Sequence, residues 1–307
     1  MSAGVALFAG DISVDLTMTI DHVPAPDEKV HATNVSESPG GVVANAAVAC
    51  ARAGGSARLL VQVGSDTAGR PTIDGVKRAG VEVVAATVDG VTCRVVILVE
   101  PHGEKRLLLY PGVSMYPSRR QVAKEPLEEI GWVHTAVYDD AASAELAERC
   151  RATAVPLSLD LEPATFPGSI DALAPAISDA EVIFCNRRAA ARLGADAEQR
   201  LFAMGARAIV FTLGAEGAVL VERGGRRAAV PPPKLPIRDT SGAGDCLAGW
   251  FVAERLRSAP GPVALARAVF AATLSCGRLG TQSSFPTRDE VAALPRYPAV
   301  TGTDTIP

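Results

Sequence analysis

A glycine-rich heptapeptide, residues 239–245 with the sequence DTSGAGD, stands directly before a helical run. Gly242, Ala243 and Gly244 allow the backbone to approach a ligand closely and to turn its N–H groups toward one point. The helix that follows adds the positive end of its dipole, so this segment predicts an anion hole suited to the charge on a transferring phosphoryl group. Asp245 lies at its rim, where a carboxylate can accept a proton from an attacking hydroxyl.

The same helix dipole predicts a depressed pKa for Asp245, which makes it a weak base that acts late in the reaction. Bond formation would by then have acidified the hydroxyl. Taken alone, however, the heptapeptide fits an ordinary helix start equally well, with an Asp cap and glycines in the turn. The catalytic interpretation therefore needs support from other parts of the chain.

Two segments near the N-terminus carry further polar groups beside glycines. Gly41 is the second of a glycine pair that leads into a helix of small residues, where Asn45 can donate and accept hydrogen bonds to hydroxyls. Asp11 and Asp15 follow the predicted strand Val5–Ala9, and paired carboxylates at the carboxyl end of a strand suit a polyol. Each segment alone also fits a solvated turn or a glycine-rich loop.

The elements that must position these groups alternate between short β-type runs and Ala-rich helical stretches. Such alternation predicts a parallel sheet with helices on both faces. The predicted strands are Val5–Ala9, Ala57–Val63, Trp132–Val137, Val155–Leu159, Glu181–Phe184, Ala208–Thr212 and Ala218–Val221. The predicted helices are Ala44–Ala53, Gly69–Ala79, Ala142–Thr153, Arg188–Leu193, Glu198–Met204, Ala243–Leu256 and Pro262–Leu279.

Two segments without helices break the alternation and predict a small second sheet. The second of them holds two extended runs around a turn, a hairpin pattern in which Glu104, Lys105 and Arg106 read as a solvated turn. Ligands of open α/β sheets bind at the carboxyl ends of the strands, so a lid there is expected. We expect a main α/β domain from residues 1–14, 36–91 and 111–297, a β lid from 15–35 and 92–110, and a loose tail at 298–307.

The composition excludes several classes of protein. The 307 residues carry a formal net charge of -4, which gives no basic field for nucleic acid. No apolar run reaches the roughly 18 residues of a membrane helix. The six cysteines are scattered and lack metal-ligand spacing, which indicates reduced thiols and a cytoplasmic protein. The four histidines also lack metal-ligand spacing, so no metal hydrolase is indicated. No Walker-type phosphate loop and no nucleophile elbow is present.

With both glycine motifs in view, the sequence resembles the PfkB, or ribokinase-like, carbohydrate kinases. Residues 239–245 are similar to the family's C-terminal signature, and residues 40–45 with 64–69 are similar to its N-terminal signature. The resemblance runs from about Val5 to Pro295. It implies a doubly wound αβα sandwich with a small β-sheet lid. It also implies transfer of the γ-phosphoryl of ATP to a hydroxyl of a sugar, sugar acid or sugar phosphate.

The resemblance also implies roles for single residues. Asp245 matches the catalytic base, and the anion hole matches Gly242, Ala243 and Gly244. The phosphoryl acceptor is matched to Asp15, Gly41 and Asn45, joined by Asp11 and Ser13. The ATP site is matched to Asn186, Thr212, Gly214 and Gly217. Asp239, with the loop at 280–284, matches a site that binds potassium in several members. The implied cofactors are ATP and Mg²⁺, with K⁺ in some members.

Two positions depart from the family pattern. The family motif Asn-x-x-Glu, which organises Mg²⁺, ends here in Ala189, so the magnesium site is left unplaced. Val42 replaces a lysine that follows the glycine pair in many ribose-specific members, which indicates a less polar pocket wall.

These departures keep two alternatives open. The first is a nucleoside kinase, in which the segment at Tyr110 near the lid would stack on a base. The second is a non-catalytic regulatory protein that binds a sugar or nucleotide. Exposed lid strands also predict a homodimer joined through the lid. The expected partners are a small-molecule substrate and a second copy, with neither nucleic acid nor membrane.

Overall fold

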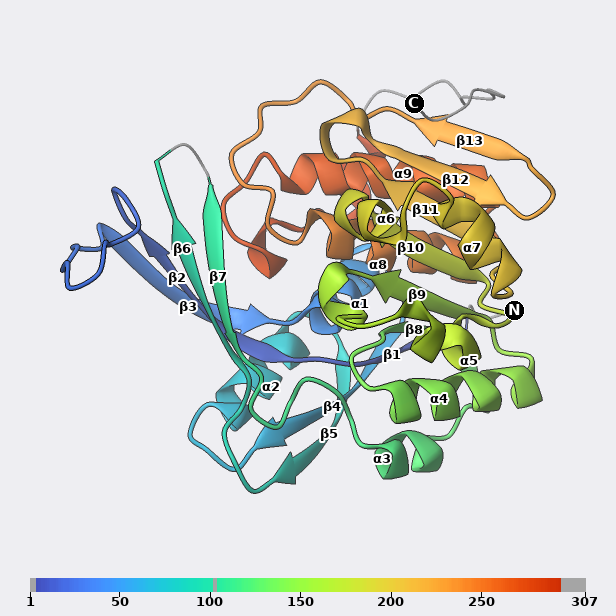
Figure 1. The fold of residues 1–307 in the computed structure, drawn as a ribbon, viewed down its shortest axis with the longest axis horizontal. Helices are drawn as coiled ribbons and strands as arrows, with labels where there is room; N and C mark the ends of the chain where they lie inside the picture. The colour runs from blue at the N-terminus through green and yellow to red at the C-terminus, as the bar shows by residue number, and fades with distance from the viewer. Residues whose placement is uncertain (1–3, 102–103, 294–307) are drawn as a thin grey trace.

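The computed structural model describes residues 4–101 and 104–293, so the predicted tail at 298–307 lies outside the described residues. A nine-stranded sheet forms its centre (Figure 1). In spatial order its strands are β13 (Arg227–Val230), β12 (Ala218–Glu222), β11 (Ala208–Thr212), β10 (Val182–Asn186), β9 (Leu157–Leu161), β8 (Ile130–Ala136), β1 (Val5–Ala9), β4 (Ala57–Gly64) and β5 (Glu82–Val88).

Seven of these strands, from β11 to β5, run parallel, and only β12 and β13 are antiparallel to their neighbours. From β1 the chain moves outward through β4 and β5, and then returns to build β8 to β11 on the other side. The winding reverses between β1 and β8, and ligands of open α/β sheets bind at the carboxyl ends of such strands. The predicted doubly wound fold is confirmed.

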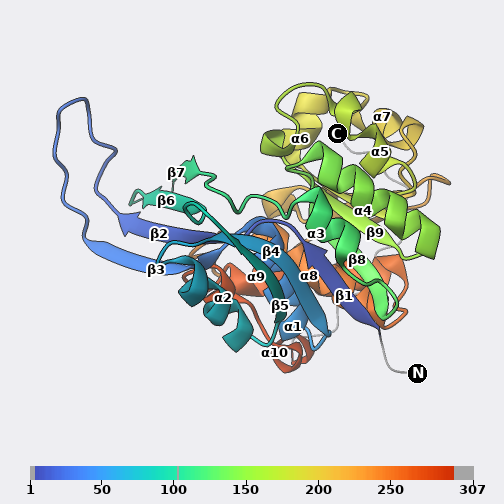
Figure 2. The ribbon, with the colours of Figure 1, turned by 90° about the horizontal axis from the view of Figure 1, so that it is seen from below.

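Helices cover both faces of the sheet (Figure 2). One face carries α1 (Val42–Arg52), α2 (Gly69–Arg78), α8 (Ala243–Leu256) and α9 (Gly261–Ser275), with α10 (Arg288–Ala292) packed against α9. The other face carries α3 (Arg119–Lys124), α4 (Asp140–Thr153), α5 (Ala174–Ile177), α6 (Arg187–Leu193) and α7 (Ala197–Ala203). The 3₁₀ turns are Pro163–Thr165, Ile170–Leu173, Gly214–Glu216 and Gln282–Ser284.

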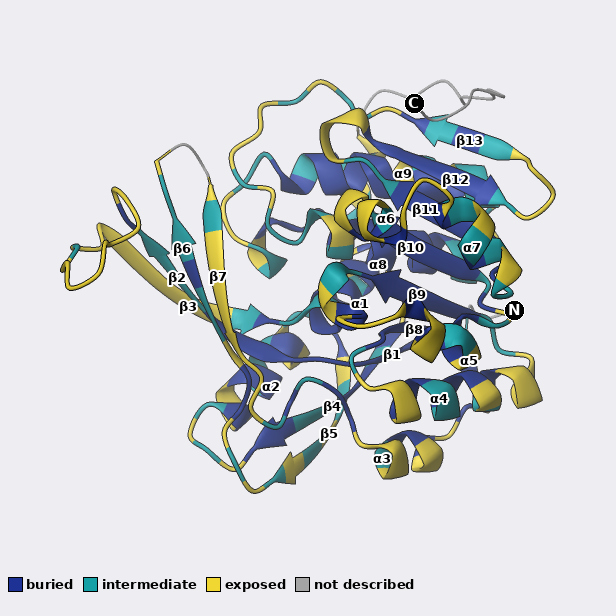
Figure 3. Cartoon of the chain, viewed as in Figure 1, coloured by how far each residue is buried: buried dark blue, intermediate teal, exposed yellow. Residues whose placement is uncertain are grey.

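Each face buries its own apolar cluster, because a strand covered on both sides presents apolar residues to both. In β1, Phe8 faces one cluster and Leu7 the other, and neither is exposed. Small residues allow α8 to pack close to α1. A Cβ at Gly249 would lie 2.1 Å from the carbonyl oxygen of Ala46. Figure 3 shows this buried sheet as the dark centre of the molecule.

The small second sheet contains β3 (Asn34–Gly40), β2 (Ser13–Thr19), β6 (Arg94–Val99) and β7 (Lys105–Tyr110), in that order. The strands β2 and β3 connect β1 to α1, and β6 and β7 follow β5. The small sheet therefore stands at the carboxyl edge of the main sheet (Figure 1). All of β3 pairs with β2, so the sheet continues to Gly40 rather than ending at residue 35. We propose residues 13–40 and 92–110 as the lid.

The structure corrects several predicted boundaries. The strands β5 and β13 were not predicted, and α9 ends at Ser275 rather than at Leu279. The strand predicted at Val155–Leu159 runs from Leu157 to Leu161, a shift that matters for the site below. Within the described ranges, no helix combines the length and the apolar character needed to cross a membrane.

Candidate active site

The heptapeptide forms the start of α8. Gly242 is left-handed, with φ of 69°, and a Cβ there would lie 2.4 Å from the methyl group of Thr281, so only glycine fits. Space is open at Gly244. The first N–H groups of a helix have no partner within it. At the start of α8, the N–H of Ala243 donates to the carbonyl oxygen of Thr240 at 3.4 Å. Gly242, Ala243 and Gly244 therefore lie at the helix start that the sequence predicted, and their role as an anion hole stays a prediction.

Asp245 contacts the other signature directly. The side-chain amide of Asn45 donates to Asp245 Oδ2 at 2.7 Å, although the two residues are 200 positions apart. The orientation of that amide is fixed by Gln282, whose Nε2 donates to Asn45 Oδ1 at 2.9 Å. Gln282 was assigned no part in the acceptor site from the sequence. Its contact shows that the loop after α9 positions the Asn45–Asp245 pair.

The electrostatics of Asp245 differ from the sequence-based expectation. Burial raises the pKa of Asp245 well above its ordinary value, against the lowering effect of the Asn45 hydrogen bond. The charges of Glu162, Asp11 and Asp15 raise it further. The expectation of a dipole-depressed pKa was therefore wrong, because burial among other acids outweighs the helix dipole.

The glycine pair makes room for Asp15. A Cβ at Gly40 would lie 2.1 Å from Asp15 Oδ2, and Gly41 has a φ of 104°, which favours glycine. Ser13 donates from its hydroxyl to Asp15 Oδ1 at 2.6 Å. Burial raises the pKa of Asp15, and the Ser13 bond opposes that rise. Asp15 and Ser13 thus form one polar group at the start of β2, where the chain enters the small sheet.

Asp11 contacts the start of α1. Its two carboxylate oxygens accept the N–H groups of Val42, at 2.8 Å, and Val43, at 2.9 Å, at the start of α1. Burial raises its pKa to about 6, against the lowering effect of these bonds. Asp11 therefore positions the helix that carries Asn45.

Two acids that the sequence analysis missed lie at the carboxyl end of β9. Asp160 is only 8% exposed, and in the described residues its side chain has no hydrogen-bond partner. Burial raises its pKa far above the ordinary value, and the charges of Glu162, Asp245 and Asp11 add to the rise. Burial also raises the pKa of Glu162, while the charge of Arg188 opposes it.

The signal for these acids was the alternation of apolar and polar residues from Leu157 to Glu162. The predicted strand ended at Leu159, two residues short, so both acids appeared to lie in a loop. In the structure Asp160 pairs with Phe184 and Leu161 with Cys185. One further step in the pairing of β9 with β10 places Glu162 opposite Asn186.

The residues expected on the nucleotide side gather on the next strands. Asn186 and Thr212 are register partners at the ends of β10 and β11. Asn186 accepts the N–H of Ala189 at 2.8 Å and so caps α6. Gly214 and Gly217, with φ of 61° and 86°, shape the turn after β11. All four predicted residues therefore lie along one sheet edge.

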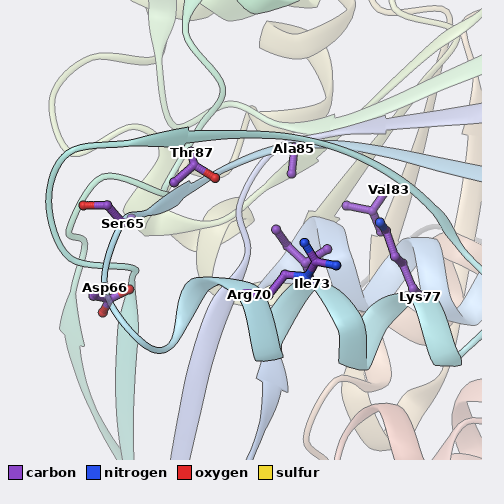
Figure 4. Close-up of a pocket in the computed structure, with 9 residues that line it drawn as sticks. Ser65, Asp66, Arg70, Ile73, Lys77, Val83, Ala85 and Thr87 are labelled. Atoms are coloured by element: carbon purple, nitrogen blue, oxygen red, sulfur yellow. The ribbon is translucent and has the colours of Figure 1, made fainter.

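The second half of the N-terminal signature anchors the segment that enters the lid. Asp66 accepts from the Thr92 hydroxyl at 2.6 Å and pairs with Arg94 at 3.2 Å. A cavity of about 330 Å³ lies beside it, between α2 and the edge strand β5 (Figure 4). Its lining contains none of the residues expected to act in catalysis, acceptor binding or nucleotide binding: it consists of Gly64, Ser65, Asp66, Arg70, Ile73, Lys77, Val83, Ala85 and Thr87. We do not assign it to the active site.

The acids do not form a closed metal cage. Among residues 4–101 and 104–293, no three His, Cys, Asp or Glu side chains are arranged to hold a metal ion. Magnesium commonly binds through one or two carboxylates, with water and substrate phosphates completing its shell. Asp160 fits that pattern because its buried carboxylate lacks a protein partner, and Glu162 lies on the same strand end.

A family model described as "pfkB family carbohydrate kinase" matches residues 8–288. The chain belongs to this family. The family, the fold and the assignment as an ATP-dependent phosphotransferase with an alcohol acceptor are thereby confirmed.

Individual relatives match over nearly their whole length. An ATP-dependent ribose-1-phosphate kinase of Halopiger xanaduensis is 30% identical over 300 residues, which are 94% of this chain and 96% of the relative. The solved ribokinase of Thermotoga maritima has a TM-score of 0.81 at 24% identity, covering 94% and 98% of the two chains. The ribokinase of Arabidopsis thaliana, solved with ribose and ATP, has a TM-score of 0.80 at 19% identity, covering 95% and 98%. These solved structures show the fold.

Proposed function

We propose that this kinase transfers the γ-phosphoryl of ATP to a hydroxyl of a sugar, sugar acid or sugar phosphate, with Asp245 as the base. The hydrogen bond from Asn45 to Asp245 carries the proposal. It brings a group suited to bind hydroxyls against the carboxylate at the rim of the anion hole. A hydroxyl held by Asn45 and Asp15 then meets the base and the phosphoryl site together.

The raised pKa of Asp245 suits this role. A base with a higher pKa accepts a proton more readily once ionised, and general bases work best with a pKa near the working pH. Asp245 takes the proton of the acceptor hydroxyl as its oxygen attacks the γ-phosphorus. The N–H groups at the start of α8 stabilise the charge on the transferring group. Closure of the lid excludes water and limits hydrolysis of ATP.

Magnesium would be held at the end of β9. Asp160 and Glu162 offer carboxylates beside Asn186, and they supply the negative charge that Ala189 lacks. When bound there, the ion would neutralise phosphate charge. Asn186, Thr212, Gly214 and Gly217 line the edge where the nucleotide is expected.

The lid gives the acceptor site an apolar wall. Asp15 pairs with Val95 and Val95 with Leu109, so these residues share one face of the small sheet. Leu107 lies on the same face, and Leu107 and Leu109 are 64% and 51% exposed. This wall favours a nucleoside as the second candidate, because a base needs an apolar surface. Tyr110 pairs with Arg94 and lies on the opposite face, so it is not placed to stack on that base.

Two further properties belong to the proposal. The edge strand β7 exposes Leu107 to Tyr110, and such an edge favours pairing with a second copy through the lid. Light scattering at assay concentration tests this, and a monomer contradicts it. The six buried, free cysteines and the use of ATP suit the cytoplasm.

The test is ADP release with Mg·ATP across pentoses, hexoses, ketoses, sugar acids, sugar phosphates and nucleosides. Ribose and ribose 1-phosphate come first, because relatives carry those names. The control variant is Asp74→Asn, which removes an exposed carboxylate that pairs with Arg70 on α2. Turnover with one acceptor that is lost in Asp245→Asn but kept in Asp74→Asn supports the proposal. Near-normal turnover of Asp245→Asn refutes it, and ligand binding without ADP formation supports the regulatory alternative.

A further inference from the structure

Lys105, the first residue of β7, reaches from the lid to the loop before α8. Its ammonium donates to Asp239 Oδ1 at 2.5 Å and also to the hydroxyl of Ser241. The Lys105 and Asp239 side chains are only 19% and 16% exposed. The sequence analysis assigned Lys105 to a solvated turn. That interpretation was wrong, since the residue closes a contact between the lid and the anion-hole loop.

Asp239 connects three segments at this point. Its Oδ1 accepts the N–H of Ser241 at 2.9 Å, and its Oδ2 accepts the N–H of Gly280 at 2.9 Å. Burial works against its ionisation, but the bonds from Lys105 and Ser241 outweigh that effect and lower its pKa. The carboxylate is therefore a charged clamp between the loop before α8 and the loop after α9.

Both clamped loops lead to the catalytic pair. Ser241 directly precedes Gly242 of the anion hole. Gly280 lies two residues before Gln282, which orients Asn45 and through it Asp245. The positive charge of the Lys105 ammonium beside Asp239 therefore stabilises both loops that lead to Asp245, the proposed base.

We propose that the Lys105 ammonium acts as a tethered monovalent cation that orders the anion-hole loop, so that the kinase needs no potassium. The proposal rests on the proposed function of the same site. Like a potassium ion, an ammonium carries one positive charge. It contacts oxygen ligands, through up to three N–H bonds, of which Asp239 and Ser241 receive two. The carboxylate that the resemblance matched to a potassium site is already neutralised by the chain itself.

The position of the lysine also links the loop to the lid. Lys105 lies on the face of the small sheet that carries Leu107 and Leu109, which is the face of Asp15. When the lid moves away from the cleft, the ammonium leaves Asp239 and the clamp loses its charge partner. Full order of the anion hole therefore requires a closed lid, which ties phosphoryl transfer to a bound acceptor.

The test compares the purified wild-type protein with Lys105→Met in sodium-only buffer and with added K⁺ or NH₄⁺. Arg106→Met is the matched control, because Arg106 is the next residue and pairs with Glu100 and Glu104 rather than with the loop. We expect the wild type and Arg106→Met to change less than about twofold with K⁺. We expect Lys105→Met to lose about tenfold in kcat, equivalent to about 1.4 kcal/mol, and to regain it with K⁺ or NH₄⁺.

Two further readouts separate this role from a merely structural or substrate-binding one. The KM of the acceptor should stay within about twofold in Lys105→Met, because the ammonium orders the loop and does not hold the substrate. The melting temperature of Lys105→Met should rise with K⁺ over Na⁺, while that of the wild type should not. The melting measurement needs no turnover, so it tests Lys105 even if no acceptor in the panel is phosphorylated.

Three results overturn the proposal. The first is strong potassium activation of the wild type. The second is loss of activity in folded Lys105→Met that neither ion restores, which would indicate direct contact with a substrate phosphate. The third is full activity of Lys105→Met in sodium alone.

Discussion

Each end of α8 holds a buried carboxylate, and the charged neighbours of the two carboxylates have opposite signs. At its C-terminal end Glu254 is 0% exposed and is surrounded by Arg267, by Arg288 at 2.8 Å and by Arg257 at 3.7 Å. At its N-terminal end Asp245 accepts a hydrogen bond from Asn45 and lies among other acids. Burial raises its pKa, and the charges of those acids add to the rise.

The difference separates an acid whose neighbours stabilise its charge from the acid that we propose as the catalytic base. Near a helix C-terminus a negative charge is unfavourable, yet Glu254 is stable there because the arginines connect it to α9 and α10. Asp245 lies at the favourable end of the dipole, but no cationic side chain pairs with it in the part of the chain that the structure describes. Its charge costs folding free energy unless a proton or substrate offsets it. Variants at the two ends should therefore move activity and stability independently.

The largest effect should follow from Asp245→Asn. Loss of a general base lowers kcat by about 10²- to 10⁴-fold. Binding of ATP, measured by calorimetry, should persist because Asn keeps the shape of the side chain. The melting temperature at pH 8 should rise because a costly buried charge is gone. The free energy of unfolding should increase by about 1 kcal/mol. A variant that is both inactive and less stable would show that Asp245 supports the fold and would weaken the comparison.

The opposite end should give the opposite result. Glu254→Gln leaves the arginines without their shared carboxylate, and breaking a buried pair costs about 3 kcal/mol or more in unfolding free energy. Denaturant unfolding measures the loss. The kcat of the folded fraction should stay near that of the wild type.

Glu222→Gln is the matched control for that variant. It breaks an exposed pair with Arg226 and should change stability by less than about 1 kcal/mol. Equal effects of the two substitutions would mean that the Glu254 cluster contributes no more than a surface pair.

The sequence predicted the fold and the glycine turn at the start of α8 because both depend on local patterns. Gly242 and Gly244 are readable as a turn before a helix, and alternating elements predict the parallel sheet. The contacts between distant segments were not readable. Nothing local indicates that Lys105 reaches Asp239, 134 positions away, or that Gln282 orients Asn45.

The charge state of the site was beyond the sequence for a related reason. A pKa depends on burial, and burial depends on how distant segments pack. Local reasoning found the helix dipole at Asp245 but neither its burial nor the effect of Glu162, Asp11 and Asp15 on its pKa. The strand predicted at Val155–Leu159 ended two residues too early, so the sequence did not place Asp160 at the site. Asp160 lies on β9, beside β8 and β10.

Asp160→Asn should give a smaller effect of the same kind as Asp245→Asn. The Asp160 side chain is buried and has no hydrogen-bond partner among the described residues, so removal of its charge should raise stability by about 1 kcal/mol. The variant should also bind Mg²⁺ more weakly in the presence of ADP, as measured by calorimetric titration. Unchanged Mg²⁺ affinity would remove Asp160 from the metal site, and a loss of stability would show that its carboxylate has a structural role.

The finest test of the comparison is the pH dependence of the stability gained in Asp245→Asn. A carboxyl with a higher pKa in the folded than in the unfolded protein contributes stability below its unfolded-state pKa of about 4. That stability is lost as the pH rises through the folded-state pKa. The wild type should therefore approach the variant in melting temperature as pH falls from 8 toward 4. The acidic limb of kcat/KM should lie above the ordinary carboxyl range for the same reason. A difference in melting temperature that stays constant with pH would show that the gain comes from packing and not from the buried charge.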